Sequence, residues 1–245
     1  MPPLISEDSI RPATPSDAAD LARLIDLAGE GIPSWLWARA AEQGESPFAV
    51  GTRRAAREDG GFSYRNAHVA EAGGHIVGML LGYRLPDPYP DEDLSELPAT
   101  LHPLIELETR AAGSWYVNAL AIDAPYRGRG VAQRLMELAE TLARSSGAGE
   151  LSLIVSESNT PARTLYEKRG FEVRGRRASV SSPGAPRFES DWLLMVKNLA
   201  ASAGGAPRRR ASPCTSRGTV TSPRARRAAM RSLISPSIGT CSVYR

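Results

Sequence analysis

Apolar residues recur along the first 200 positions with two alternating spacings, one typical of helices and one typical of strands. In residues 13–31, Leu21, Leu24, Ile25 and Ala28 follow the i, i+3, i+4, i+7 spacing of a single helix face. The same spacing predicts further helices near Pro33, over 47–58 and 104–111, from about 128 to 144, and around 161–169. Short apolar runs predict strands at 9–11, on both sides of the Gly73-Gly74 turn signal, and at 115–122, 151–156, 171–180 and 191–199.

The order of these elements predicts a mixed α/β domain. The strand–helix–strand unit over 115–156 favours parallel pairing at the centre of a sheet, and hairpins on either side favour antiparallel edges. Residues 86–103 are rich in proline and acidic side chains, which predicts an irregular insertion. We therefore expect one domain over residues 1–199, with a mixed central β-sheet flanked by helices.

Composition separates residues 200–245 from this domain. Residues 201–245 carry nine of the 30 Lys and Arg side chains and none of the 27 Asp and Glu. The net charge of +3 is therefore the sum of an acidic body and a basic tail. Because the tail is rich in Arg, Ser and Pro and lacks periodicity, we expect it to be disordered. Its only aromatic residue is Tyr244, so base stacking is poorly supported and no specific nucleic-acid partner is expected.

Several classes of site are disfavoured by residue content alone. Both cysteines, Cys214 and Cys241, lie in the tail, so the body has no cysteine nucleophile or cysteine-bound metal. The histidines His68, His75 and His102 lack the spacing of a metal site, and we expect no metal. The sequence has no apolar run of about 18 residues and no secretory pattern at its start, so we expect a cytoplasmic protein without a membrane partner.

The segment from the strand at 115–122 into the next helix has the features of a phosphate-binding loop. Arg127-Gly128-Arg129-Gly130-Val131-Ala132 opens the helix, and the N–H groups at a helix N-terminus bind phosphates. Glycines allow close approach of the backbone, and arginines add charged donors. A tight strand-to-helix turn is the alternative interpretation. The segment does not match the GKS/GKT or GxGxxG phosphate loops.

A second block follows about twenty residues after that helix begins. A buried strand ends at Ser156, Asn159 begins a short helix that carries Tyr166, and Gly170-Phe171 starts the next strand. Together the two blocks resemble the GNAT superfamily of N-acetyltransferases. Arg127, Gly130 and Ala132 match its (R/Q)xxGx(G/A) motif, and the second block matches its Asn…Tyr…Gly-Phe pattern. The resemblance spans residues 8–199 in element order, with the specific motifs in 115–171.

The resemblance implies an acetyl-CoA-dependent enzyme, with acetyl-CoA as co-substrate. It would transfer an acetyl group to a primary amine of a small molecule or peptide, by direct attack in a ternary complex. The pantetheine arm would pair with the backbone of Leu120, Ala121 and Ile122, and Asn159 would bind the same arm. Tyr166 would act as general acid toward the sulfur. The pyrophosphate would bind Arg127, Gly128, Arg129, Gly130, Val131 and Ala132.

The residue that deprotonates the amine is less well defined. Many family members place a Glu early on the central strand, but residues 114–118 contain no carboxylate. Tyr116 and Asn118 share one strand face and are candidates to order a water that relays the proton. Glu71, Glu106 and Glu108 are the other candidates. The missing carboxylate leaves open a non-catalytic acyl-CoA-binding module on the same scaffold.

The acceptor site is the least determined part of the sequence. An aromatic and acidic rim, which would attract a cationic amine, is one interpretation of the early helices and the 86–103 insertion. Core packing and a solvated loop are the other. The residues concerned are Trp35, Trp37, Phe62, Tyr64, Tyr83, Tyr89 and Asp91–Glu96. We also regard a homodimer as possible.

Overall fold

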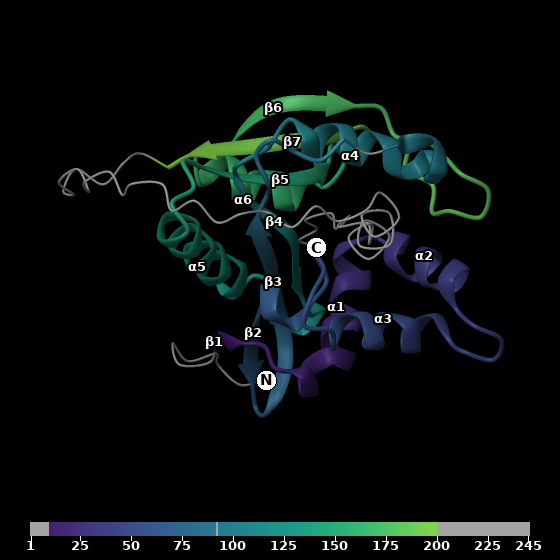
Figure 1. The fold of residues 1–245 in the computed structure, drawn as a ribbon. Helices are drawn as coiled ribbons and strands as arrows, with labels where there is room; N and C mark the ends of the chain where they lie inside the picture. Colours follow the sequence, from purple (N-terminus) through teal and green to yellow (C-terminus); the bar gives the residue numbers. More distant parts are fainter. Residues whose placement is uncertain (1–9, 92, 200–245) are drawn as a thin grey trace, which may run out of the picture.

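The computed structural model describes residues 10–91 and 93–199. Its centre is a seven-stranded sheet in the order β1-β2-β3-β4-β5-β7-β6 (Figure 1). The strands are β1 (Ile10–Pro12), β2 (Ala67–Ala72), β3 (His75–Arg84), β4 (Trp115–Ile122), β5 (Glu150–Ser156), β6 (Glu172–Arg177) and β7 (Trp192–Asn198). The pair β4–β5 is parallel and the other neighbours are antiparallel, which confirms the predicted mixed sheet.

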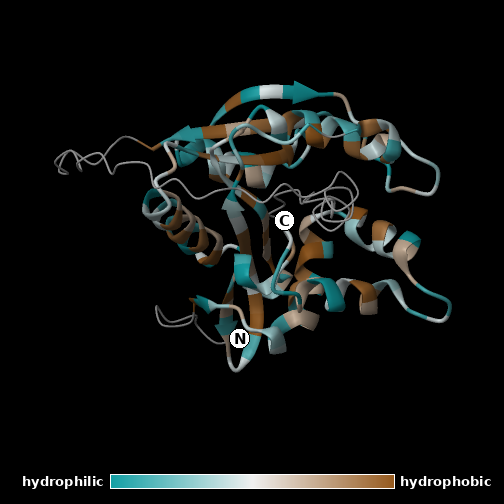
Figure 2. Ribbon diagram, viewed as in Figure 1, coloured by the Kyte–Doolittle hydropathy of each residue, from teal (hydrophilic) through white to brown (hydrophobic). Residues whose placement is uncertain are grey.

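Helices cover both faces of the sheet and bury three apolar clusters against it. On one face, α5 (Val131–Ser145) and α6 (Thr160–Lys168) pack against β3, β4, β5 and β7. On the other face, α1 (Ala18–Ala28) and α3 (Pro47–Ala55) cover β2–β4, and α4 (His102–Thr109) lies over β5, β7 and β6. Helix α2 (Ile32–Ala40) packs mainly against α3 and α1. Figure 2 shows apolar residues on the central strands and on the helix sides that face them, whereas the edge strand β6 is mostly hydrophilic.

Strands β4 and β5 run side by side for only a short distance. In the described part of the chain they pair over Trp115–Val117 and Leu151–Leu153, and each continues with a different neighbour. Beyond Val117, β4 follows β3, with a bulge at Asn118 because Leu81 pairs with Ala119 and Gly82 with Val117. A bulge bends its strand and increases the local twist. Backbone pairing between the two central strands therefore stops at Val117 and Leu153, which leaves a gap in the ladder between them from Asn118 onward.

Most predicted elements are present, and the differences lie at their ends. The helix expected from about 128 begins at Val131, because Gly128 and Gly130 have positive φ angles and stay outside it. The helix expected over 104–111 spans His102–Thr109, and the strand expected over 171–180 stops at Arg177. Among the described residues of the 86–103 insertion, the short 3-10 helices Leu94–Glu96 and Ala99–Leu101 are the regular structure that precedes α4.

Of the two interpretations of the early aromatic residues, core packing holds for Trp37 and Phe62. Trp37 is only 2% exposed and packs where a side chain on Gly51 would collide with its ring. Phe62 is 4% exposed and belongs to the same apolar cluster as α1. Both residues stabilise the core rather than line an open surface. Over residues 10–91 and 93–199, the helices are too short or too polar to cross a membrane. The predicted disordered tail lies outside the described residues.

Candidate functional site

The loop between β4 and α5 is fixed to the sheet before it reaches the glycines. The N–H of Asp123 donates to the carbonyl oxygen of Val77 on β3 at 2.8 Å. A 3-10 turn, Ala124–Tyr126, follows. The Arg127 side chain then folds back, and its Nε donates to the carbonyl oxygen of Ile122 at 2.8 Å. The beginning of the loop is therefore held by a backbone hydrogen bond to β3 and by a side-chain hydrogen bond to β4.

Two glycines then shape the N-terminus of α5. Gly128 has φ +69° and Gly130, the N-cap residue, has φ +81°, a region that L-residues other than glycine rarely adopt. The carbonyl of Gly130 accepts the N–H of Arg134 at 3.1 Å, so the helix proper starts directly after this glycine. The first N–H groups of a helix lack intrahelical partners and carry partial positive charge. The N-terminus of this 15-residue helix therefore carries partial positive charge beside the gap.

A pocket of about 240 Å³ lies against this terminus. It is lined by Ile122, Tyr126, Arg127, Gly128, Gly130, Val131, Ala132, Gln133 and Leu165. Six of these residues were predicted from the sequence. The remaining loop residue, Arg129, does not line the pocket; its guanidinium lies over the Tyr126 ring at 5.8 Å from the centroid. Backbone donors, glycines that leave room for a ligand, and a nearby guanidinium suit the charge and size of a pyrophosphate.

The gap between β4 and β5 leads to this pocket with backbone groups along one side. Backbone groups of successive strand residues point to opposite neighbours. The N–H of Asp123 points to β3, so the backbone groups of Ala121 point to β3 as well. The backbone groups of Leu120 and Ile122 point the opposite way, into the gap. The carbonyl of Ile122 is already bound to Arg127. Of the three strand residues predicted to bind the arm, the backbone of Leu120 and Ile122 therefore faces the gap, and that of Ala121 does not.

The other side of the gap is formed by the end of β5 and by α6. The Oδ1 of Asn159 accepts the N–H of Ala162 at 3.2 Å and caps α6, which orients the side-chain amide. Tyr166 is fully buried, and its ring lies 5.7 Å from that of Phe171. Leu165, next to it, lines the pocket. The two motif residues thus lie on the same short helix as a pocket-lining residue, and Tyr166 also contributes to the core.

The bulge in β4 brings Asn118 and Tyr116 next to a second tyrosine, Tyr83 on β3. The Nδ2 of Asn118 donates to the Tyr83 hydroxyl at 3.2 Å. The Tyr83 and Tyr116 rings meet edge to face, with centroids 6.2 Å apart. Asn118 and Tyr116 are buried, whereas Tyr83 is partly exposed. The expected shared face of Tyr116 and Asn118 is consistent with this arrangement.

The carboxylates considered as bases have other neighbours. Glu71 lies on β2, one strand further from the gap than β3, and its Oε1 pairs with Arg11 at 2.6 Å. Glu106 on α4 pairs with Arg177. Glu108 is 2% exposed on α4. Glu71 and Glu106 are therefore already engaged in ion pairs. Asn118 and the two tyrosines lie beside the gap and are better placed than these carboxylates to order a water there.

Sequence patterns missed several residues of this site. Tyr126, Gln133 and Leu165 line the pocket, although only their neighbours matched a motif. The role of Tyr83 as a hydrogen-bond partner of Asn118 depends on the pairing of β3 with β4 across a bulge. The sequence marked Tyr83 only as one of the candidate aromatic residues of the acceptor rim. Contacts of this kind depend on register, which local spacing does not specify.

Comparison with known proteins agrees with this geometry. A probable N-acetyltransferase family 8 member 5 of Mus musculus is 30% identical over 123 residues, 49% of this chain and 45% of the relative. The peptidyl-lysine N-acetyltransferase YjaB of Salmonella typhimurium is 41% identical over 71 residues, 29% of this chain and 45% of the relative. The chain thus spans about half the length of the curated relatives it matches.

A solved acetyltransferase structure supports the fold. It is 22% identical, and the match covers 77% of this chain and 98% of that protein with a TM-score of 0.52. The model of the acetyltransferase (GNAT) family matches residues 30–171, which is more than half of the chain and runs from just before α2 through both motifs. The chain therefore belongs to the GNAT family of acetyltransferases.

Proposed function

We propose that the protein transfers an acetyl group from acetyl-CoA to a primary amine by direct attack in a ternary complex. One observation carries this proposal: the gap between β4 and β5 leads directly to the glycine-shaped N-terminus of α5. An extended thioester ligand can place its arm in the gap while its phosphates meet the helix. Family membership supports acetyl transfer as the reaction, because the family uses acetyl-CoA.

The coenzyme would be held mainly by backbone groups. The first-turn N–H groups of α5 would bind the pyrophosphate, with Arg127 and Arg129 supplying positive charge. Gly128 and Gly130 would allow close approach because they have no side chains. In the gap, the backbone of Leu120, which points away from β3, would pair with the amides of the arm, and the side-chain amide of Asn159 would bind from α6. These contacts orient the thioester along β4.

The chemical step needs three contributions from the protein. A protonated amine has an ordinary pKa of about 10, so it must lose a proton before it attacks. Asn118 and Tyr116, with the Tyr83 hydroxyl, would order a water that takes this proton. The N–H of Leu120 would donate to the carbonyl oxygen as negative charge develops there. When the carbon–sulfur bond breaks, the Tyr166 hydroxyl would give a proton to the departing thiolate.

The acceptor would approach from the face that carries α2 and the loop after β6. A second pocket, of about 420 Å³, lies there between Asp26 and Glu30 at the end of α1 and Arg187 and Phe188 in that loop. Phe188 packs in the same cluster as Tyr83, which connects this pocket to the bulge. Its carboxylates favour a cationic amine, and the peptidyl-lysine specificity of one relative is compatible with a lysine-like acceptor.

Calorimetry with coenzyme A, followed by a panel of amines with acetyl-CoA, tests the proposal. We expect the full chain to bind coenzyme A and to release free thiol only when an accepted amine is present. Thiol release that follows a ping-pong pattern would contradict direct attack. Tight binding without transfer to small amines, lysine peptides or peptide N-termini would instead support the acyl-CoA-binding module. Failure to bind coenzyme A would overturn both functions.

A further inference from the structure

Asp123 places a negative charge at the beginning of the coenzyme loop. It is the only acidic residue between Glu108 and Glu137 in the sequence, and it precedes Arg127 by four positions. Its backbone starts the 3-10 turn of the loop, because its carbonyl accepts the N–H of Tyr126 at 2.9 Å. A carboxylate at this place would repel the phosphates of an incoming coenzyme unless a cation neutralised it.

Arg23 on α1 supplies that cation from a distant part of the sequence. Its Nη1 lies 2.5 Å from the Oδ1 of Asp123. Its Nη2 donates to the carbonyl oxygen of Ile76 on β3 and to the Oδ1 of Asp20, each at 3.2 Å. The guanidinium thus connects α1, the start of β3 and the end of β4. Three acceptors in different elements fix its orientation more firmly than a single surface pair could.

The environment keeps Arg23 charged and in place. Burial lowers the pKa of its guanidinium, but hydrogen bonds and charges of Asp123 and Asp20 outweigh burial and leave the pKa above its ordinary value. The side chain of Asp123 is 25% exposed, so its charge is only partly screened by water. Leu24 and Ile25, the next residues of α1, are buried in the core and anchor the helix. The carboxylate therefore faces a fixed positive charge.

We propose that Arg23 is a positioning residue for coenzyme binding, which turns the Asp123 carboxylate toward α1 and neutralises it beside the phosphate-binding loop. This inference rests on the proposed function, because the ligand of the loop is coenzyme A. Arg23 acts through Asp123 and takes no part in the chemical step. Its removal therefore weakens coenzyme binding and raises the KM for acetyl-CoA, while kcat stays within about twofold.

The test measures coenzyme A affinity by calorimetry for wild type, Arg23→Met, Asp123→Asn and the double variant. Arg23→Met should raise the Kd about tenfold, since it leaves Asp123 charged near the phosphates. Asp123→Asn should leave the Kd unchanged or lower it. The double variant should return to within about threefold of wild type, because the repelling charge has gone. The increase in Arg23→Met should shrink at 0.5 M salt, as expected of a screened charge.

Two further variants separate this role from a merely structural one. Arg23→Lys keeps the positive charge and should bind coenzyme A within about threefold of wild type. Arg11→Met is the matched control, because Arg11 also pairs with two carboxylates, Asp17 and Glu71, at similar exposure but on β1. It should lower the melting temperature without changing the Kd. An unchanged Kd in Arg23→Met, or no recovery in the double variant, would overturn the inference, whereas a wild type that does not bind coenzyme A would overturn the proposed function itself.

Discussion

The two ends of the β4–β5 pair are held by different interactions. At the paired end, over Trp115–Val117, the strands are joined by backbone pairing and tight side-chain packing. At the separated end, from Asn118 onward, each strand is held by elements outside the pair. The same two strands thus form a paired joint at one end and a gap in the backbone ladder at the other. The gap needs no lid or special loop, because it follows from where the pairing stops.

The paired end is closed by small residues and short contacts. The hydroxyls of Ser114 and Ser152 lie 2.6 Å apart across the two strands. The Trp115 ring fills the space beside Gly82 on β3, where a Cβ atom would lie 2.4 Å from the ring. Interiors packed at this density tolerate added volume poorly. This end therefore fixes the angle at which β4 and β5 diverge.

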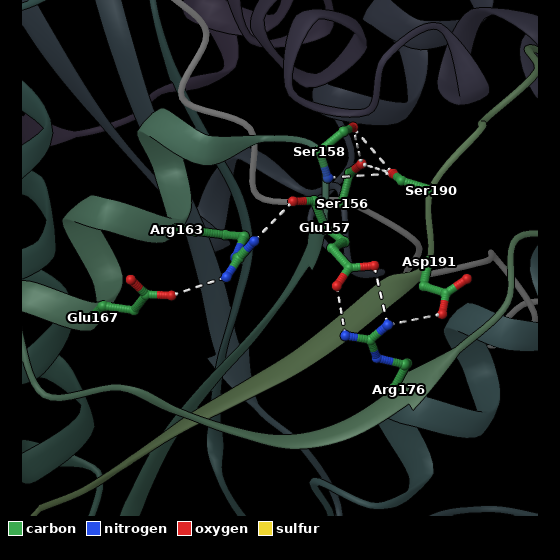
Figure 3. A network of polar contacts seen from close by, with 8 residues as sticks. All are labelled: Ser156, Glu157, Ser158, Arg163, Glu167, Arg176, Ser190 and Asp191. Carbon is green, nitrogen blue, oxygen red and sulfur yellow. Dashed lines mark hydrogen bonds and ion pairs between the residues drawn. The ribbon is translucent and has the colours of Figure 1, made fainter.

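The separated end is held by charges and hydroxyls around its rim. On the β4 side, Arg23 binds Asp123. On the β5 side, Arg176 on β6 pairs with Glu157 and Asp191, at 2.5 and 3.3 Å. Figure 3 shows the contacts of Arg176 together with the hydroxyls of Ser156, Ser158 and Ser190, which lie 2.7–3.0 Å from one another. The strand ends are kept apart because each is bound to its own surroundings.

The largest effect is expected from a side chain placed at the mouth of the gap. Gly130→Glu adds bulk, a positive-φ strain and negative charge where the phosphates would bind, so the Kd for coenzyme A should rise at least about 100-fold. Calorimetry measures this change. Gly44→Glu is the matched control, since Gly44 has φ +86° and open space around it. An equal loss in both variants would mean that backbone strain, and not the phosphate site, causes the effect.

The next largest effect should come from the β5 side of the gap. Tyr166→Phe removes one hydroxyl from α6 and should lower kcat about 100-fold if that hydroxyl protonates the thiolate, with the KM for acetyl-CoA changed by less than about threefold. Steady-state kinetics with an accepted amine provides the measurement. Tyr64→Phe, in the apolar cluster of α1 and α3, is the control and should keep wild-type rates. Unchanged kinetics in Tyr166→Phe would remove it as general acid.

The contrast between the two ends also explains what the sequence could and could not predict. The strand at 115–122 and the start of a helix at Asn159 were predicted correctly, because spacing and local backbone geometry determine them. The helix expected from about 128 was also present, although it begins only after Gly130. The bulge at Asn118 depends on how β3 pairs with β4, which local spacing does not specify. The partner of Asp123, one hundred positions away, and the burial of Trp37 depend on tertiary packing, and nothing in the local pattern marked them.

A smaller effect, on stability alone, is expected at the paired end. Gly82→Ala places a Cβ atom against the Trp115 ring and 2.7 Å from the carbonyl oxygen of Tyr116, so unfolding should become easier by about 2 kcal/mol. Chemical denaturation measures this free energy. Gly149→Ala, with no neighbour within 4 Å among the described residues and no positive φ, should be nearly neutral. A stable Gly82→Ala protein would show that the joint is looser than the structure indicates.

The smallest effect should come from the charged rim on the β5 side. Arg176→Met removes a pair of exposed ion pairs, which are worth little on average, so global stability should fall by only about 0.5 kcal/mol. Local opening should be easier to see, because the N–H of Glu157 donates to the carbonyl oxygen of Asp191 at 2.8 Å beside this pair. Hydrogen exchange at Glu157 should accelerate while exchange at Val117, in the paired end, stays unchanged.

Arg174→Met, on the same strand but paired with Glu150, is the control and should leave Glu157 protected. Faster exchange at Val117 as well would mean that the two ends open together, and that the rim holds the whole joint rather than one side of the gap.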